Sequence, residues 1–182
     1  MKIVEQDQAA QPIFTADRFI LRPVQRSDQA LIGLYCADER VARMTPGIPH
    51  PLPPGATEAF VDQAMTPTDH KQVWVIDGSL QGHAEVMGLI NLNAMDRQQS
   101  EIGYWVAPAF WNTGIASEAV RTIIAANPQN ARQLYAEVFQ DNPGSARVLT
   151  NCGFDYLGDA ESFSVAREAT VATWTYVLKL DR

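Results

Sequence analysis

The pattern of hydrophobic and polar residues changes its period at one place near the middle of the chain. Residues Glu101 to Val106 alternate and are rich in aromatic side chains, which predicts a strand that packs on one face. Pro108 ends that strand because proline has no N–H to donate to a neighbour. From Ala116 the apolar residues follow helical spacing until Asn127–Pro128 interrupts it. The stretch therefore predicts a strand, a turn of small residues and a helix that begins close to Gly114.

Similar patterns divide the rest of the chain into strands and helices. Strands are expected at 19–23, 73–76, 83–92, 134–139, 154–157 and 173–179, with a connection over 161–172. Helices are expected after Ser27 or Asp28, at 57–65 and at 142–152. The first of these helices has an apolar stripe made of Ala30, Leu31, Leu34 and Tyr35. Residues 1–16 are polar and weakly patterned, so we expect a loose lead-in to a single domain that spans residues 1–182.

The turn between the central strand and helix has the features of an anion site. Its glycine and alanine residues leave main-chain N–H groups uncovered, and the start of the helix adds a partial positive charge. The turn lacks the GxxxxGK[ST] of a P-loop and the GxGxxG of a dinucleotide-binding fold. An ordinary strand-to-helix connection that contains a glycine is the alternative interpretation.

A second segment, from Asn142 to Phe154, carries signals for a short helix at both of its ends. Asn142 is a favourable N-cap, and Pro143 suits the first helical position. Gly153 suits the left-handed position that commonly follows a helix. Ser145 then lies at the third position of this helix.

These two segments resemble the two signatures of the GNAT N-acetyltransferases. The first resembles motif A, whose turn holds the pyrophosphate of acetyl-CoA. It is most similar to the W-G-x-G-x-A-x-E-A of the ribosomal-protein N-terminal acetyltransferase (Rim-like) branch, matched from Trp111 to Ala119 with Asn112 in place of a glycine. Asparagine tolerates left-handed backbone angles, so the turn can keep its shape. The second resembles N-x-x-S-x-R-V-L-x-x-x-G-F, matched from Asn142 to Phe154.

The resemblance implies a mixed α/β GNAT fold, with a twisted sheet of six to seven strands flanked by about four helices, and acetyl-CoA as cosubstrate. The diphosphate of the cosubstrate is expected on the N–H groups of the turn, and its pantetheine arm beside the preceding strand. Pro108 and the aromatic residues should keep the next strand from closing there, and a free N–H near Val106 would stabilise the oxyanion. The expected cofactor-binding residues are Trp105, Val106, Trp111, Asn112, Thr113, Gly114, Ile115, Ala116, Ser117, Asn142 and Ser145.

Two residues are candidates for the chemistry of acetyl transfer. Ser145 can hydrogen-bond the leaving thiolate, a role that its counterpart has in the Rim-like branch, or it can serve only the start of its helix. Glu101 can take a proton from the amine, directly or through water, or it can be a solvated residue at the end of a strand. Glu161 is the second candidate for the base.

Composition narrows the remaining possibilities. The chain has 182 residues and a net charge of −7, which argues against a nucleic-acid partner. It shows no signal-peptide pattern and no apolar run of membrane-spanning length, so we expect a cytoplasmic protein without a membrane partner. Cys36 and Cys152 fit reduced core thiols, and no spacing typical of a metal site occurs. His50 lies in a proline-rich loop over 45–55 that suits the wall of a cleft.

The sequence thus predicts an N-acetyltransferase that uses direct attack by a primary amine in a ternary complex. A domain that binds acyl-CoA as a sensor or scaffold, without turning it over, is the alternative from another class. The acceptor, either a protein N-terminus or a small amine, is not encoded in a recognisable pattern. A monomer or a homodimer is compatible with the sequence.

Overall fold

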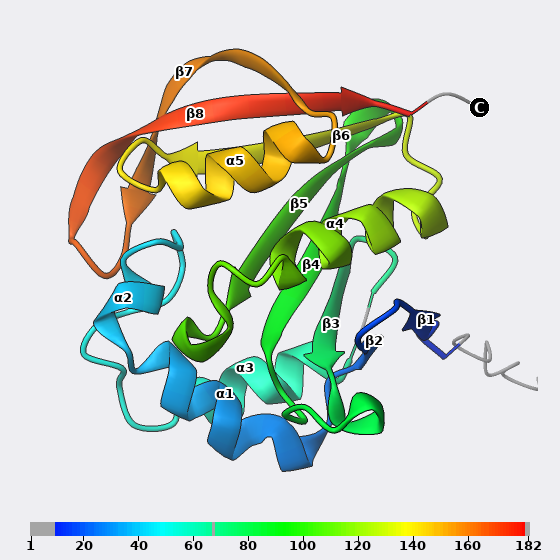
Figure 1. Cartoon of the computed structure of the whole chain (residues 1–182). Helices are drawn as coiled ribbons and strands as arrows, with labels where there is room; N and C mark the ends of the chain where they lie inside the picture. Colours follow the sequence, from blue (N-terminus) through cyan, green and yellow to red (C-terminus); the bar gives the residue numbers. More distant parts are fainter. Residues whose placement is uncertain (1–9, 67, 181–182) are drawn as a thin grey trace, which may run out of the picture.

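The computed structural model describes residues 10–66 and 68–180, which form an eight-stranded mixed sheet with helices on both faces (Figure 1). The strand order is β1-β2-β3-β4-β5-β6-β8-β7. The strands are β1 Phe14–Thr15, β2 Ile20–Pro23, β3 Lys71–Asp77, β4 Gly88–Met95, β5 Gln99–Val106, β6 Gln133–Phe139, β7 Asp155–Ser164 and β8 Ala169–Lys179. The helices are α1 Gln29–Cys36, α2 Glu39–Ala42, α3 Ala56–Ala64, α4 Ile115–Ala126 and α5 Pro143–Asn151.

The central strands β5 and β6 are parallel, joined by α4, and they separate early. Their pairing covers Gln99 with Gln133, Ser100 with Leu134 and Glu101 with Tyr135. Beyond Glu101, β5 stays paired with β4 on its other side as far as Val106, while β6 runs away with β8 (Figure 1). The gap in the sheet that was expected beside Val106 is therefore present.

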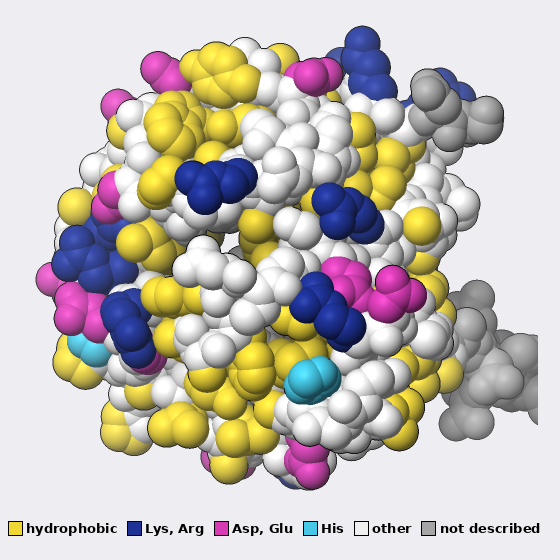
Figure 2. All heavy atoms as spheres, in the orientation of Figure 1, with side chains coloured by type: hydrophobic (Ala, Val, Ile, Leu, Met, Phe, Trp, Pro, Cys, Tyr) yellow, Lys and Arg dark blue, Asp and Glu magenta, His cyan; other side chains and the backbone are white. Residues whose placement is uncertain are grey.

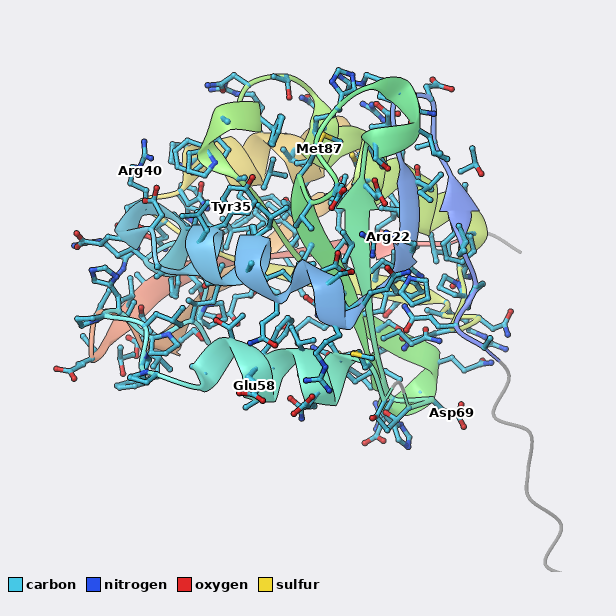
Figure 3. The ribbon with its side chains drawn as sticks, turned by 90° about the horizontal axis from the view of Figure 1, so that it is seen from below. Arg22, Tyr35, Arg40, Glu58, Asp69 and Met87 are labelled. Atoms are coloured by element: carbon cyan, nitrogen blue, oxygen red, sulfur yellow. The ribbon has the colours of Figure 1, made fainter. Side chains whose placement is uncertain are left out.

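Each face of the sheet has its own hydrophobic core. On one face α4 and α5 pack against the sheet, and Ile102 and Val106 of β5 lie in that core. On the other face α1 and α3 run side by side and cover β3 and β4, as Figure 3 shows from below. Trp105 faces this second core, where its ring meets Tyr35 edge-on at 6.2 Å. Because side chains alternate along a strand, neighbouring residues of β5 serve opposite faces.

Several expected elements have different bounds. The strand expected over 83–92 begins only at Gly88, because residues before it form a loop closed by hydrogen bonds from His83 N to Gly78 O and from Gly78 N to Ala84 O. The expected connection over 161–172 is mostly strand, since β7 and β8 form a long hairpin whose turn is residues 165–168. Hydrogen bonds of the turn decide the first case, and pairing within the β7–β8 hairpin decides the second. The short helix α2 was not expected.

The lead-in also differs from the expectation. Residues 1–9 of it lie outside the described residues, but Phe14–Thr15 form β1 and pair with β2. The side chain of Gln11 is buried and donates from Nε2 to the carbonyl of Val73 at 2.8 Å. The sheet therefore has eight strands where six to seven were expected.

Helix α1 shows the largest difference from its predicted pattern. Leu34, expected in its buried stripe, is 65% exposed, whereas Ile32 and Cys36 are buried. Asp28 precedes the helix as expected of an N-cap, but its side chain accepts no hydrogen bond from the helix. The carboxylate instead accepts two hydrogen bonds of 2.8 Å from the guanidinium of Arg22.

Arg22 is the centre of a buried ionic cluster. It also donates from Nε to Asp77 at 2.6 Å, and all three side chains are buried. Hydrogen bonds to Asp28 hold the pKa of Arg22 above its usual value. Burial acts to raise the pKa of Asp77, but hydrogen bonds from Ser79 and Arg22 outweigh it and hold that pKa below its usual range. The cluster ties the loop before α1 to β2 and β3.

We predict that Asp28→Ala lowers the free energy of unfolding by about 3 kcal/mol, because it leaves a buried guanidinium short of a partner. The matched control is Asp62→Ala, which breaks the ion pair of Asp62 with Arg26 in which both side chains are more than half exposed. That change should cost less than about 1 kcal/mol. Urea unfolding of both variants at pH 7 measures the difference, and equal losses would contradict a structural role for the cluster.

Candidate active site

The turn before α4 has the backbone shape that an anion site needs. Asn112 and Gly114 both adopt left-handed angles, with φ of 59° and 82°. The replacement of a motif glycine by Asn112 is therefore accommodated in the way that the sequence predicted. Gly114 directly precedes the first residue of α4, so the N–H groups at the helix start lie beside it. These groups and the helix dipole favour a bound anion.

Arg18, in the segment before β2, fixes this turn by hydrogen bonds to its carbonyl side. Its guanidinium donates from Nη1 to the carbonyl oxygen of Thr113 at 2.7 Å and from Nε to the carboxylate of Glu118 at 2.5 Å. Its main-chain N–H donates to the same carboxylate at 2.9 Å. Glu118 is in the first turn of α4, so this contact fastens the start of the helix to the segment before β2. Local patterns gave no signal for it, because Arg18 and Glu118 are 100 residues apart.

The main-chain groups at the end of β5 differ in whether they have a hydrogen-bond partner. Ala107 N–H donates to Met87 O at 2.9 Å, toward the β4 side. Since main-chain groups alternate along a strand, the N–H of Val106 faces away from β4, toward the space that β6 has left. The carbonyl oxygen of Val106 accepts a hydrogen bond of 2.7 Å from Nε1 of Trp111. The guanidinium of Arg40 lies over the same indole, 5.6 Å from its centre.

A pocket of about 480 Å³ joins the turn, the end of β5 and α5. Figure 2 shows the hollow on this face, with Lys and Arg side chains around it. All the expected cofactor-binding residues line the pocket except Thr113, whose hydroxyl donates to the carbonyl of Phe110. Residues that were not expected there are Arg40, Val41, Met44, Thr45, Tyr104, Phe110, Gly144, Arg147, Val148 and Asn151. Arg40 to Thr45 reach the pocket from α2 and the start of the proline-rich loop.

Ser145 lies in this pocket at the start of α5. The side chain of Asn142 caps the helix by accepting the N–H of Ser145 at 3.3 Å, so the cap uses the main chain of Ser145 and not its hydroxyl. The Ser145 hydroxyl donates to the hydroxyl of Tyr104 at 3.0 Å. The Tyr104 hydroxyl in turn donates to the carbonyl oxygen of Ser145 at 3.1 Å. Burial raises the pKa of Tyr104 above its usual value.

The two candidate bases lie elsewhere. Glu101 does not line the pocket; it is at the last paired position of β5 and β6, roughly 16 Å along β5 from Val106. By alternation it shares a face with Trp105 and lies opposite the face of Tyr104 and α5. Glu161 is exposed on β7, paired with Ala172. The geometry thus brings Ser145 to the pocket and places both carboxylates outside it.

Other chemistry has little support in the described part of the chain. Cys36 and Cys152 are free thiols, and burial raises the pKa of Cys36 to about 12 and that of Cys152 above its usual value. Both are therefore poor nucleophiles. No group of three or more His, Cys, Asp or Glu within residues 10–66 and 68–180 is arranged to hold a metal ion. None of the helices described is long and apolar enough to cross a membrane.

The chain belongs to the acetyltransferase (GNAT) domain family, whose model matches residues 18–155. Both the turn and the helix start with Ser145 fall within this match. The chain is accordingly a GNAT N-acetyltransferase that depends on acetyl-CoA. The uncharacterised N-acetyltransferase YoaA of Bacillus subtilis (strain 168) is 26% identical over 153 residues, which cover 81% of this chain and 85% of that protein.

Solved structures share the fold at lower identity. RimL, a ribosomal L7/L12 α-N-protein acetyltransferase solved with coenzyme A, superimposes with a TM-score of 0.79 and 16% identity over 93% of this chain and 99% of that one. The spermidine N-acetyltransferase of Vibrio cholerae, solved with CoA and spermine, superimposes with a TM-score of 0.74 and 16% identity, covering 90% and 96%. At such identities the likeness shows the common fold.

Proposed function

We propose that this chain transfers the acetyl group of acetyl-CoA to a primary amine by direct attack in a ternary complex. One observation carries the proposal: a single pocket joins the anion-binding turn, the unpaired edge of β5 and the hydroxyl of Ser145. A sensor domain would need only the first two of these features. Membership of an N-acetyltransferase family supports turnover over mere binding.

The cosubstrate would bind along the pocket from the turn inward. Main-chain N–H groups of Asn112 to Ala116 would hold the diphosphate, with the hydroxyl of Ser117 beside them. The pantetheine arm would take the place of the missing strand beside Trp105 and Val106, where its amides find free main-chain groups. Solved relatives that contain CoA support this class of ligand.

The transfer itself needs three groups around the thioester. The amine nitrogen attacks the carbonyl carbon, and the main-chain N–H of Val106 would stabilise the oxyanion that forms. The C–S bond then breaks, and the sulfur leaves with its electron pair. The hydroxyl of Ser145 would hydrogen-bond this thiolate, whose free thiol has a pKa near ~8.5. The acetylated amine loses its extra proton to a base or to water.

The acceptor would approach from the other face of the sheet. Beyond Glu101 no main-chain pairing joins β5 to β6, so the acceptor would enter between these two strands. Glu101 lies at the closed end of the gap and, by alternation, on the face away from α5. From there its carboxylate would receive the amine proton through a chain of waters, because the distance along β5 is too long for one bridging water. Glu101 is kept as the proposed base on this basis.

Relatives suggest two kinds of acceptor. RimL modifies a protein α-amine, and the Vibrio cholerae enzyme modifies spermidine. We propose an acceptor from one of these classes, a peptide N-terminus or a small amine. A panel of N-terminal peptides and small amines, incubated with acetyl-CoA and scored by release of free thiol, tests the proposal. Acetyl-CoA binding without thiol release from any amine in the panel would favour the sensor function.

We predict that Gly114→Asp weakens CoA binding more than tenfold, about 1.4 kcal/mol or more, because it sets a carboxylate against the diphosphate. Gly114→Ala is the matched control. It places a side chain at the same left-handed φ of 82° but adds no charge. Calorimetric titration of both variants with CoA therefore separates charge from backbone strain. Equal affinity in the two variants would contradict the proposed diphosphate site.

Ser145→Ala should lower kcat by about 10² while leaving CoA affinity nearly unchanged, since the lost contact forms in the transition state. Helix stability should also survive, because the cap uses the N–H of residue 145. Asn142→Ala is the control: it removes the cap, costs ~1 kcal/mol of stability and keeps the hydroxyl. Measurements of kcat and of melting temperature on both variants distinguish a catalytic role of Ser145 from a capping role. A fully active Ser145→Ala enzyme would contradict the catalytic role.

For the base, Glu101→Gln should reduce kcat/KM by about 10² at neutral pH, because glutamine cannot accept the proton. The loss should shrink as the pH rises and the amine deprotonates in solution. Glu161→Gln is the matched control and should retain full activity, given its exposed position on β7. The reverse result, with activity lost only in Glu161→Gln, would transfer the role to Glu161.

A further inference from the structure

Tyr104 is in direct contact with Ser145. The two side chains come from different elements, β5 and α5, and 41 residues separate them in the chain. Both line the pocket. We propose that Tyr104 is a positioning residue, whose hydroxyl directs the hydroxyl of Ser145 toward the departing sulfur. This inference rests on the proposed function, in which Ser145 meets the leaving thiolate.

The geometry allows two hydrogen-bond arrangements of the same atoms. In the first arrangement the Ser145 hydroxyl donates to Tyr104, and the Tyr104 hydroxyl donates to the carbonyl oxygen of Ser145. The Tyr104 oxygen lies 3.0 Å from Oγ and 3.1 Å from that carbonyl oxygen, so either can accept its hydrogen. If the Tyr104 hydrogen turns to Oγ, the Ser145 hydrogen becomes free to point into the pocket. The pair can thus change from a closed to an open arrangement by rotation of two hydroxyls.

The open arrangement strengthens the contact that the reaction needs. Hydrogen bonds in a chain polarise one another, so a Ser145 hydroxyl that accepts from Tyr104 is a better donor to the sulfur. Burial keeps the Tyr104 hydroxyl protonated, so it acts as donor and not as a base. Neither hydroxyl has to ionise. The sulfur leaves with the electron pair of the C–S bond, and its charge is met by Ser145.

The contact also aligns α5 with the part of β5 that has lost its neighbouring strand. Pairing between β5 and β6 ends at Glu101, three residues before Tyr104. Helix α5 follows β6 in the chain and packs against α4 and β6. The two hydrogen bonds of Tyr104 link α5 to β5 as well, and they act on the residue that would face the thioester.

The test is a double-mutant cycle of Tyr104→Phe and Ser145→Ala, with kcat and the KM for acetyl-CoA as readouts. Tyr104→Phe keeps the ring and removes the hydroxyl. In the wild-type background it should lower kcat by about tenfold and change KM by less than about twofold. In the Ser145→Ala background the same change should alter kcat by less than about twofold, because the hydroxyl acts only through Ser145. Titration with CoA gives the concentration of folded enzyme in each preparation, to which kcat is normalised.

Tyr176→Phe is the matched control, since Tyr176 is another buried tyrosine of the same core. It should leave kcat unchanged. An unchanged kcat in Tyr104→Phe, or an equal loss in both backgrounds, would overturn the inference. Its failure is distinguishable from that of the proposed function: a fully active Ser145→Ala enzyme contradicts the role of Ser145 itself, whereas a slow Ser145→Ala beside a fully active Tyr104→Phe contradicts only the role of Tyr104.

Discussion

The separation of β5 from β6 leaves the main-chain groups at the end of β5 without a neighbouring strand on one side. Unpaired N–H and C=O groups inside a protein need partners, and here one of them already has its own. The indole of Trp111 takes the carbonyl of Val106, which leaves the N–H beside the pocket for a ligand. The proposed place of the pantetheine arm and the proposed stabilisation of the oxyanion therefore both depend on one break in a parallel strand pair.

The turn before α4 is held in its shape by its backbone angles and by the contacts of Arg18. Asn112 and Gly114 have left-handed backbone angles and direct the chain into the helix. The guanidinium of Arg18 holds the turn by donating to both Thr113 and Glu118. A guanidinium on the carbonyl side of the turn leaves the opposite, N–H side open to an anion. The glutamate that the family motif carries at Glu118 thereby has a structural explanation, as the anchor of the helix start.

Much of the fold could be predicted from local patterns, and most of the expected residues that line the pocket followed from the resemblance to the GNAT signatures. The strand, turn and helix from β5 to α4 and the capped helix α5 were expected close to their observed bounds. The errors have a common cause. The length of the β7–β8 hairpin depends on which residues pair across it, and the buried face of α1 depends on the packing of that helix against α3. The carboxylate of Asp28 is bound by Arg22, in a cluster that also needs Asp77 of β3. Local preferences carry no information about such partners.

What the sequence by itself determined is the set of local conformations that the site requires. Asn142 and Pro143 start α5, and Gly114 permits the left-handed angle before α4, because capping and backbone angles depend on near neighbours. Only the tertiary structure decided which side chains meet. The strand order and the divergence after Glu101 bring Tyr104 to Ser145 and place Glu101 on the other face of the sheet. Long-range contacts of this kind follow from how strands pair and separate in space, and no spacing along the chain specifies them.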